Sequence, residues 1–169
     1  MTYEEKNGKP IKIEFKEFDL KALEKSWEWL NDPQIKELTI TPDFDKESQR
    51  KWFESLKNKT DYFIRTMEHN GNPIGVAGIK KITETDGEFF GYIGNKDYWG
   101  KKAGVQMMKY LIDYAISRNL KSIYGIMLKT NTRIYGLCKK LGFKVEKDID
   151  NKTIMMRLNF NSIGKTPGL

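Results

Sequence analysis

The stretch EFFGYIGNKDYWGKKAGVQMM, residues 88–108, decides how the rest of this chain folds, because a glycine-bearing strand runs directly into a helix. Aromatic and apolar residues at 88–95 predict the strand, and apolar residues three, four and seven apart between Val105 and Ala115 predict a long amphipathic helix. The start of that helix is poorly suited to packing alone, since Gly100 has no capping side chain and two lysines follow it. We therefore expect its first N–H groups to bind a negatively charged ligand.

The composition limits the class of protein. The 169 residues suit one domain, which we place at 1–160, with a frayed tail at 161–169. No apolar run approaches the roughly 20 residues of a membrane span, and residues 1–15 carry acids in place of an apolar export signal. One cysteine excludes an intrachain disulfide, and one cysteine with one histidine argues against a zinc site, so no metal is expected. These features favour a cytoplasmic protein without a membrane partner.

The net charge of +7 favours an anionic partner, although scattered lysines on a solvated surface explain it equally well. A basic nucleic-acid-binding module is the alternative from another class of protein. The sequence has no helix-turn-helix spacing, no aromatic RNA-binding strand motif and no zinc ligands, so nucleic acid is not the expected partner. The basic residues that keep this alternative open lie around one late helix: Arg133, Lys139, Lys140 and Lys144.

Hydrophobic periodicity and turn residues predict the element order β-α-α-β-β-β-α-β-α-β-β. Strands separated by a helix imply one parallel pairing and hairpins imply antiparallel pairings, so we predict an α+β fold with a mixed sheet and helices on both faces. His69 falls in a predicted hairpin turn and is expected to be solvated. The expected strands are 11–18, 61–68, 74–82, 88–95 and 120–128, with a closing pair within 144–160. The expected helix caps are Asp19, Asp45 and Asn131, and the face after Asp19 holds Leu20, Leu23, Trp27 and Leu30.

The helix start at 99–105 has the features of a phosphate-binding cradle. Gly100 and Gly104 allow a ligand to approach the backbone, and Lys101 and Lys102 add positive charge. A plain loop-to-helix junction with two solvated lysines is the alternative interpretation.

Together with SIYGIMLKTNTRIYGLCKKLGF at 122–143, this stretch resembles the core of the GCN5-related N-acetyltransferases (GNAT), over residues 88–143. The family's cradle has the form R/Q-x-x-G-x-G/A, and N-x-x-A-x-x-x-Y-x-x-x-G-F usually follows it. Trp99 here replaces the usual Arg or Gln, and Lys102 replaces the first glycine, which is tolerable for a helical φ. Cys138 stands where the family often has a tyrosine that serves as general acid.

The resemblance implies a single GNAT-like domain that transfers the acetyl group of acetyl-coenzyme A (acetyl-CoA) to a primary amine, by direct attack of the amine on the thioester. It also implies that backbone groups of Tyr92, Ile93 and Gly94 bind the pantetheine arm, and that Asn131 faces the cofactor while capping its helix. The cradle residues implied by the resemblance are Trp99, Gly100, Lys101, Lys102, Ala103, Gly104 and Val105.

The catalytic candidates follow from what amine acetylation requires. The attacking amine must lose a proton, and Glu88 is the candidate base, directly or through water, because alternation places it on one face with Phe90 and Tyr92. A surface glutamate beside a turn is the alternative. The leaving thiolate is helped by a proton donor, for which Cys138 and Tyr135 are candidates, each with packing as its alternative role.

The acceptor site implied by the resemblance lies in residues 30–53 and the following hairpin. This segment resembles a branch that includes acetyltransferases of ribosomal-protein N-termini and of nucleotide-linked amino sugars. The short chain favours a small-molecule acceptor, and we expect a nucleotide-linked amino sugar and a monomer or homodimer. Protein N-terminal acetylation and a non-catalytic acyl-CoA-binding protein are the alternatives. An aromatic wall is expected from Phe44, Trp52, Phe90 and Tyr92, unless these residues belong to the core.

Overall fold

Strand β3 (Asn72–Lys80) lies at the centre of the fold, because it is buried on both faces of the sheet. In the computed structural model, which describes residues 11–163, Val76 of β3 packs with Ala22 and Leu23 of one helix layer. Its neighbour Ala77 packs with Leu111 of the opposite layer. Alternation along a single strand thus joins two cores, and the predicted mixed sheet with helices on both faces is confirmed.

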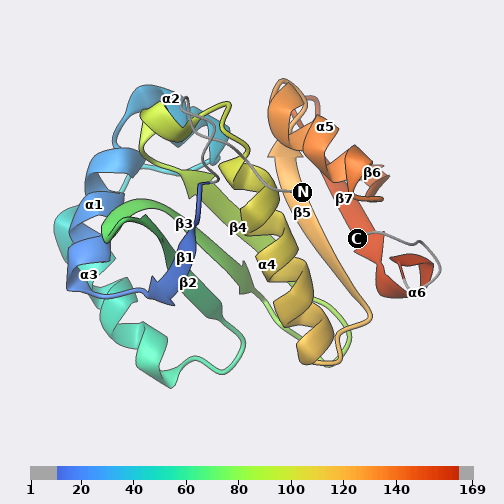
Figure 1. Cartoon of the computed structure of the whole chain (residues 1–169), viewed down its shortest axis with the longest axis horizontal. Helices are drawn as coiled ribbons and strands as arrows, with labels where there is room; N and C mark the ends of the chain where they lie inside the picture. Colours follow the sequence, from blue (N-terminus) through green and yellow to red (C-terminus); the bar gives the residue numbers. More distant parts are fainter. Residues whose placement is uncertain (1–10, 164–169) are drawn as a thin grey trace.

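The sheet has seven strands in the order β1-β2-β3-β4-β5-β7-β6 (Figure 1). All neighbouring strands pair antiparallel except β4 and β5, which are parallel. The sequence prediction of one parallel pair among hairpins is therefore confirmed. The remaining strands are β1 (Glu14–Glu17), β2 (Phe63–His69), β4 (Glu88–Ile93), β5 (Ser122–Leu128), β6 (Lys144–Asp148) and β7 (Thr153–Asn159).

Three helices begin where the sequence places capping residues. The Asp19 side chain accepts a hydrogen bond from the backbone N–H of Ala22, Asp45 forms a capping box with Ser48, and Asn131 caps a late helix. Helices α4 and α5 pack into the core cluster on one face, and α1 and α3 into the cluster on the other. The helices are α1 (Leu20–Leu30), α2 (Pro33–Leu38), α3 (Lys46–Ser55), α4 (Ala103–Ser117), α5 (Thr132–Lys140) and α6 (Phe160–Ile163), with 3-10 turns η1 (Leu56–Asn58) and η2 (Lys96–Tyr98).

Two expectations about local environment are wrong. Leu20 is 59% exposed, while Ala22, Leu23 and Ser26 are buried. The inward face of α1 is therefore rotated, because small side chains let the helix lie close to the sheet. His69 is not a solvated turn residue, since it ends β2.

His69 is only 8% exposed, and its Nδ1 lies 2.6 Å from the hydroxyl oxygen of Tyr98 in η2. The turn itself is formed by Asn70 and Gly71, which both have positive φ. His69 therefore ties the end of β2 to the segment that leads into α4.

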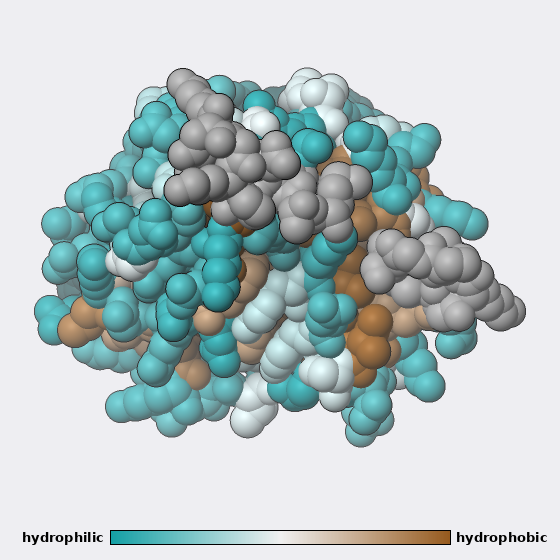
Figure 2. All heavy atoms as spheres, viewed as in Figure 1, coloured by the Kyte–Doolittle hydropathy of each residue, from teal (hydrophilic) through white to brown (hydrophobic). Residues whose placement is uncertain are grey.

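Figure 2 shows a largely hydrophilic face with a narrow hydrophobic band beside α4. Within residues 11–163, no helix combines the length and apolarity that a membrane crossing requires. Residues 160–163 form the short helix α6, so the tail expected to fray at 161–169 begins within a helix. Residues 1–10 and 164–169 lie outside the described part, and with them lie the rest of that tail and most of the segment expected to lack an export signal.

The sheet forks between β4 and β5. Within the described residues, the two strands pair at one position, Glu88 with Tyr124, and then separate toward their carboxyl ends (Figure 1). The ring of Phe89 lies against the backbone of Gly125 just beyond that pair and meets Phe143 edge-on at 5.6 Å. Phe89 thus acts as a wedge at the branch point.

Gly125→Ala tests this wedge. A Cβ at Gly125 would overlap the buried ring of Phe89, so the free energy of unfolding should fall by about 1–3 kcal/mol. Gly136→Ala is the matched control, since a Cβ at Gly136 meets nothing within 4 Å and alanine is the better helix former by about 1 kcal/mol. Urea denaturation of both variants provides the measurement. An unchanged Gly125→Ala variant would show that the wedge does not hold the fork open.

Candidate active site

Two cavities meet on β4. The first, the α4 cavity, has a volume of about 680 Å³ and is lined by the start of α4, by α5 and by the end of β4. The second, the aromatic cavity, has a volume of about 550 Å³ and lies between β4 and the segments from α1 to α3. The residues that line both cavities, and so mark their junction, are Leu38, Thr39, Gly91, Tyr92, Asn131 and Ile134.

The start of α4 carries no side-chain cap. Its N-cap is Lys102, with φ 62° in the left-handed region, so the expectation that this lysine is tolerated with a helical φ is wrong. A non-glycine residue there costs about 1–2 kcal/mol, which gives a physical reason for the glycine of the family's pattern at this position. Gly100 also has a positive φ, 76°. The bend places the first N–H groups of α4 on the wall of the α4 cavity.

The charge of the α4 cavity is uniformly positive. Among the described residues that line it, every charged side chain is cationic: Lys102, Lys109, Arg133 and Lys140. An anionic ligand is therefore favoured by side-chain charge as well as by the helix start.

The glycines on this wall leave room for such a ligand. A Cβ at Gly104 would meet Leu137 at 3.5 Å, an ordinary contact, and a Cβ at Gly136 would meet nothing within 4 Å. Neither glycine is thus required by internal packing, although glycine in a helix costs about 1 kcal/mol relative to alanine. The residues present fit a diphosphate held at the helix start.

The fork exposes alternate backbone groups of β4. The Gly87 carbonyl accepts a hydrogen bond from Tyr124 N–H across the gap, so Gly91 and Ile93 direct their backbone groups to the same side. Gly94 instead donates its N–H to the Ile74 carbonyl. The backbone groups facing the gap are therefore those of Gly91 and Ile93, not those of Tyr92 and Gly94.

The side chain of Trp99 is hydrogen-bonded to one of the backbone groups that face the gap. Its indole N–H donates to the Ile93 carbonyl at 2.8 Å, and the Arg133 guanidinium lies 5.3 Å from the centre of its ring. Lys101 instead lies over the ring of Tyr98 and does not line the cavity. The predicted cofactor residues that line the α4 cavity are Tyr92, Ile93, Trp99, Gly100, Lys102, Ala103, Gly104, Val105 and Asn131.

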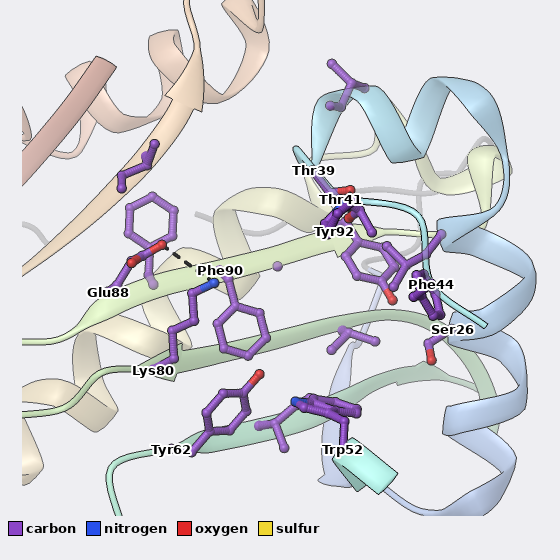
Figure 3. Close-up of a pocket in the computed structure, with 18 of the residues that line it drawn as sticks. Ser26, Thr39, Thr41, Phe44, Trp52, Tyr62, Lys80, Glu88, Phe90 and Tyr92 are labelled. Carbon is purple, nitrogen blue, oxygen red and sulfur yellow. Dashed lines mark hydrogen bonds and ion pairs between the residues drawn. The ribbon is translucent and has the colours of Figure 1, made fainter. Parts of the chain in front are cut away.

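The aromatic cavity contains the predicted wall and the predicted base. Figure 3 shows Phe90 and Tyr92 projecting from β4 toward Trp52 and Tyr62, and Phe44 also lines this cavity. Burial raises the pKa of Tyr62 to about 12 and the pKa of Tyr92 well above its usual value. Both phenols therefore remain protonated near neutral pH.

Glu88 lies at the opposite end of this cavity from Tyr92 (Figure 3). Its carboxylate is 3.7 Å from the Lys80 ammonium and 3.5 Å from the Lys81 ammonium. Within the described residues, its buried Oε1 has no hydrogen-bond partner. The same residues contain no acidic, histidine or cysteine cluster that could hold a metal ion. The Oε1 of Glu88 is thus able to accept a hydrogen bond from water or from a ligand in the cavity.

The two proton donors expected from the sequence do not reach either cavity. Helix α5 turns Arg133, Leu137 and Lys140 toward the α4 cavity, and Tyr135 and Cys138 lie off those positions. Cys138 has no exposed surface, and burial raises the pKa of its thiol to about 12. Tyr135 packs against the core. Both residues match the packing role that the sequence left open.

A forked mixed sheet beside a cation-lined, uncapped helix start fits an enzyme that uses a diphosphate-bearing carrier. The sequence model of the family described as Acetyltransferase (GNAT) domain matches residues 12–144. The chain belongs to this family, and it is therefore an N-acetyltransferase of the acetyl-CoA-dependent type.

Solved structures share the fold. A domain from Methanocaldococcus jannaschii is 20% identical with a TM-score of 0.79, over 88% of this chain and 99% of that one. Spermidine N-acetyltransferase from Vibrio cholerae, in complex with CoA and spermine, is 16% identical with a TM-score of 0.80, over 87% and 95%. The N-acetyltransferase PseH from Campylobacter jejuni, in complex with acetyl coenzyme A, is 19% identical with a TM-score of 0.67, over 88% and 99%.

Several residues of the site were missed by sequence reasoning. The sequence does give a signal for Gly136, because glycine inside a short helix lowers helix stability and so indicates that something other than helix stability favours glycine there. Lys109, within the predicted amphipathic helix, also lines the α4 cavity and was not among the predicted site residues. Thr39 and Thr41 gave no signal, since their importance depends on where α2 lies against β4.

Gly104→Asp tests the cradle with two effects of opposite sign. An acid in the first turn of α4 stabilises the helix by about 0.3–1 kcal/mol, so the melting temperature of the free protein should be unchanged or higher. The same carboxylate faces the proposed diphosphate, so the Kd for acetyl-CoA should rise more than tenfold. Calorimetric titration measures the Kd, with Gly104→Ala as the control that adds a Cβ without charge. Equal affinity of Gly104→Asp and the unmodified protein for acetyl-CoA would show that the start of α4 does not bind the diphosphate.

Proposed function

We propose that this N-acetyltransferase acetylates the primary amine of a small acceptor bound in the aromatic cavity, and that the acceptor is a nucleotide-linked amino sugar. One observation carries the proposal: the α4 cavity and the aromatic cavity share their lining at Gly91 and Tyr92. A carrier in one cavity and an amine in the other meet at the junction to which these two residues belong.

The chain's own residues supply binding and proton transfer. When bound, acetyl-CoA supplies the thioester carbonyl that the amine attacks. The first N–H groups of α4 with Lys102 and Arg133 hold the diphosphate, and Gly91 offers its backbone beside the acetyl group. Glu88 lies about 10 Å along β4 from Gly91, so it receives the amine's proton through water.

The lining of the aromatic cavity supports the acceptor class. Its volume of about 550 Å³ suits one small ligand, since such sites span about 300–1,000 Å³. Phe44, Trp52 and Phe90 offer faces on which a sugar or base ring stacks. Thr41 adds a hydroxyl to this lining, whereas the Ser26 hydroxyl is hydrogen-bonded to the Gln49 amide and the Leu23 carbonyl.

An amine panel tests the acceptor. Release of free thiol from acetyl-CoA is measured with UDP-linked amino sugars, spermidine and a short peptide with a free N-terminus. A kcat/KM at least tenfold higher for an amino sugar than for the other two is the expected result. Preference for spermidine or for the peptide would contradict the acceptor class but not the reaction. Tight acetyl-CoA binding without turnover of any amine would instead indicate a non-catalytic acyl-CoA-binding protein.

Glu88→Gln tests the base. The amide keeps the shape of the side chain but accepts no proton, so kcat should fall by about 10²–10⁴-fold, with little change in the KM for acetyl-CoA. Lys81→Gln is the matched control, because it removes an ion-pair partner of Glu88 and leaves the carboxylate in place. A Glu88→Gln variant with full kcat would assign the proton to another acceptor.

A further inference from the structure

The C-terminus of α2 ends in a strained turn beside the junction of the two cavities. The N–H of Thr41 donates to the Lys36 carbonyl and the N–H of Ile40 to the Glu37 carbonyl, both at 3.1 Å. This is a Schellman motif, which requires a left-handed residue after the cap and usually has glycine there. Ile40 occupies that position with φ 54°, a conformation that is unfavourable for a residue with a Cβ and more so for a β-branched one.

Burial of Ile40 does not offset this strain, since its side chain is 44% exposed. The turn instead brings together the hydroxyls of the residues on either side. The Oγ1 atoms of Thr39 and Thr41 lie 2.5 Å apart, and Figure 3 shows both threonines beside Tyr92. Ile40 has a strained backbone without being buried in the core. Such strain indicates that the positions of the neighbouring residues, Thr39 and Thr41, have a functional role.

The neighbouring carbonyl decides which of the two threonine hydroxyls donates the hydrogen bond between them. The Oγ1 of Thr39 lies 2.8 Å from the Ile35 carbonyl, and a carbonyl only accepts, so the single proton of Thr39 lies in that hydrogen bond. The 2.5 Å contact between the two hydroxyls therefore uses the proton of Thr41. The lone pairs of Thr41 are left to accept a hydrogen bond from the aromatic cavity, which Thr41 lines.

The pair lies closer to the junction than the proposed base does. Thr39 lines both cavities, whereas Thr41 and Glu88 line only the aromatic cavity. Thr41 lies at the junction through its hydroxyl contact with Thr39. Along β4, Glu88 is about 13 Å from Tyr92, and Phe90 stands between them in Figure 3. The amine that attacks the thioester must reach the junction, so the nearby hydroxyl meets it there.

We propose that the Thr41 hydroxyl accepts a hydrogen bond from the acceptor's reactive amine, and that Thr39 is a positioning residue that keeps Thr41 in the accepting state. This inference rests on the proposed function. A neutral primary amine has two N–H donors and one lone pair. Donation of one N–H to Thr41 holds the nitrogen so that its lone pair faces the thioester carbonyl.

Thr41→Val tests the contact, since valine has the same shape without the hydroxyl. With the best amine of the panel, kcat/KM for the amine should fall about tenfold, the loss expected for one removed hydrogen bond of about 1.4 kcal/mol. The KM for acetyl-CoA should not change. Thr41→Ser restores the hydroxyl and should restore kcat/KM to within about twofold. Loss of activity in both variants to the same extent would reduce Thr41 to a packing role and overturn the assignment.

Thr39→Val tests the positioning role. It removes the acceptor for the Thr41 proton, so kcat/KM for the amine should fall about threefold or more, again without a change in the KM for acetyl-CoA. A lower melting temperature with unaltered kcat/KM would make Thr39 merely structural and contradict its role.

The two levels of failure are distinguishable. Turnover by the unmodified protein with an unchanged kcat/KM in Thr41→Val overturns the threonine assignment alone. An unmodified protein that binds acetyl-CoA and acetylates no amine overturns the proposed function and this inference with it.

Discussion

The single parallel pair between Glu88 and Tyr124 is the constraint on which the rest of the structure depends. It joins the antiparallel strands β1 to β4 to the antiparallel strands β5, β7 and β6. Because Phe89 wedges against Gly125 directly after it, β4 continues with one edge open. Backbone groups at such an edge need partners when water is removed. An extended ligand along β4 would supply these hydrogen-bond partners, as an additional strand between β4 and β5 would.

The walls of this opening carry strain that packing does not require. Lys102 adopts a left-handed φ at the start of α4, and Ile40 does so at the end of α2. Each costs about 1–2 kcal/mol, a large amount against a total stability of about 5–15 kcal/mol. The first bend exposes the α4 N–H groups to one cavity, and the second brings two hydroxyls to the other. Stability is thus given up at the two places where ligands would meet the protein.

Sequence reasoning succeeded where the cause is local. Asp19, Asp45 and Asn131 cap their helices within three residues, and the chemistry of such caps is visible in the sequence. Sequence reasoning failed where the environment of a residue depends on segments that are distant in the sequence. His69 is buried because Tyr98, 29 positions away, lies against it.

The α5 helix shows the same limit. The register of its inward face separates Leu137, which lines the α4 cavity, from Cys138, which has no exposed surface. A shift of one residue around a helix turns a side chain by about 100°. The motif therefore predicted residues that line the α4 cavity, but the proton donors that it suggested line neither cavity.

The distribution of charge also depends on the fold, since Arg133 and Lys140 line a concave cavity beside an uncapped helix start. A nucleic-acid duplex needs an exposed basic stripe, whereas cations gathered in a hollow about 680 Å³ in volume match a small phosphorylated carrier.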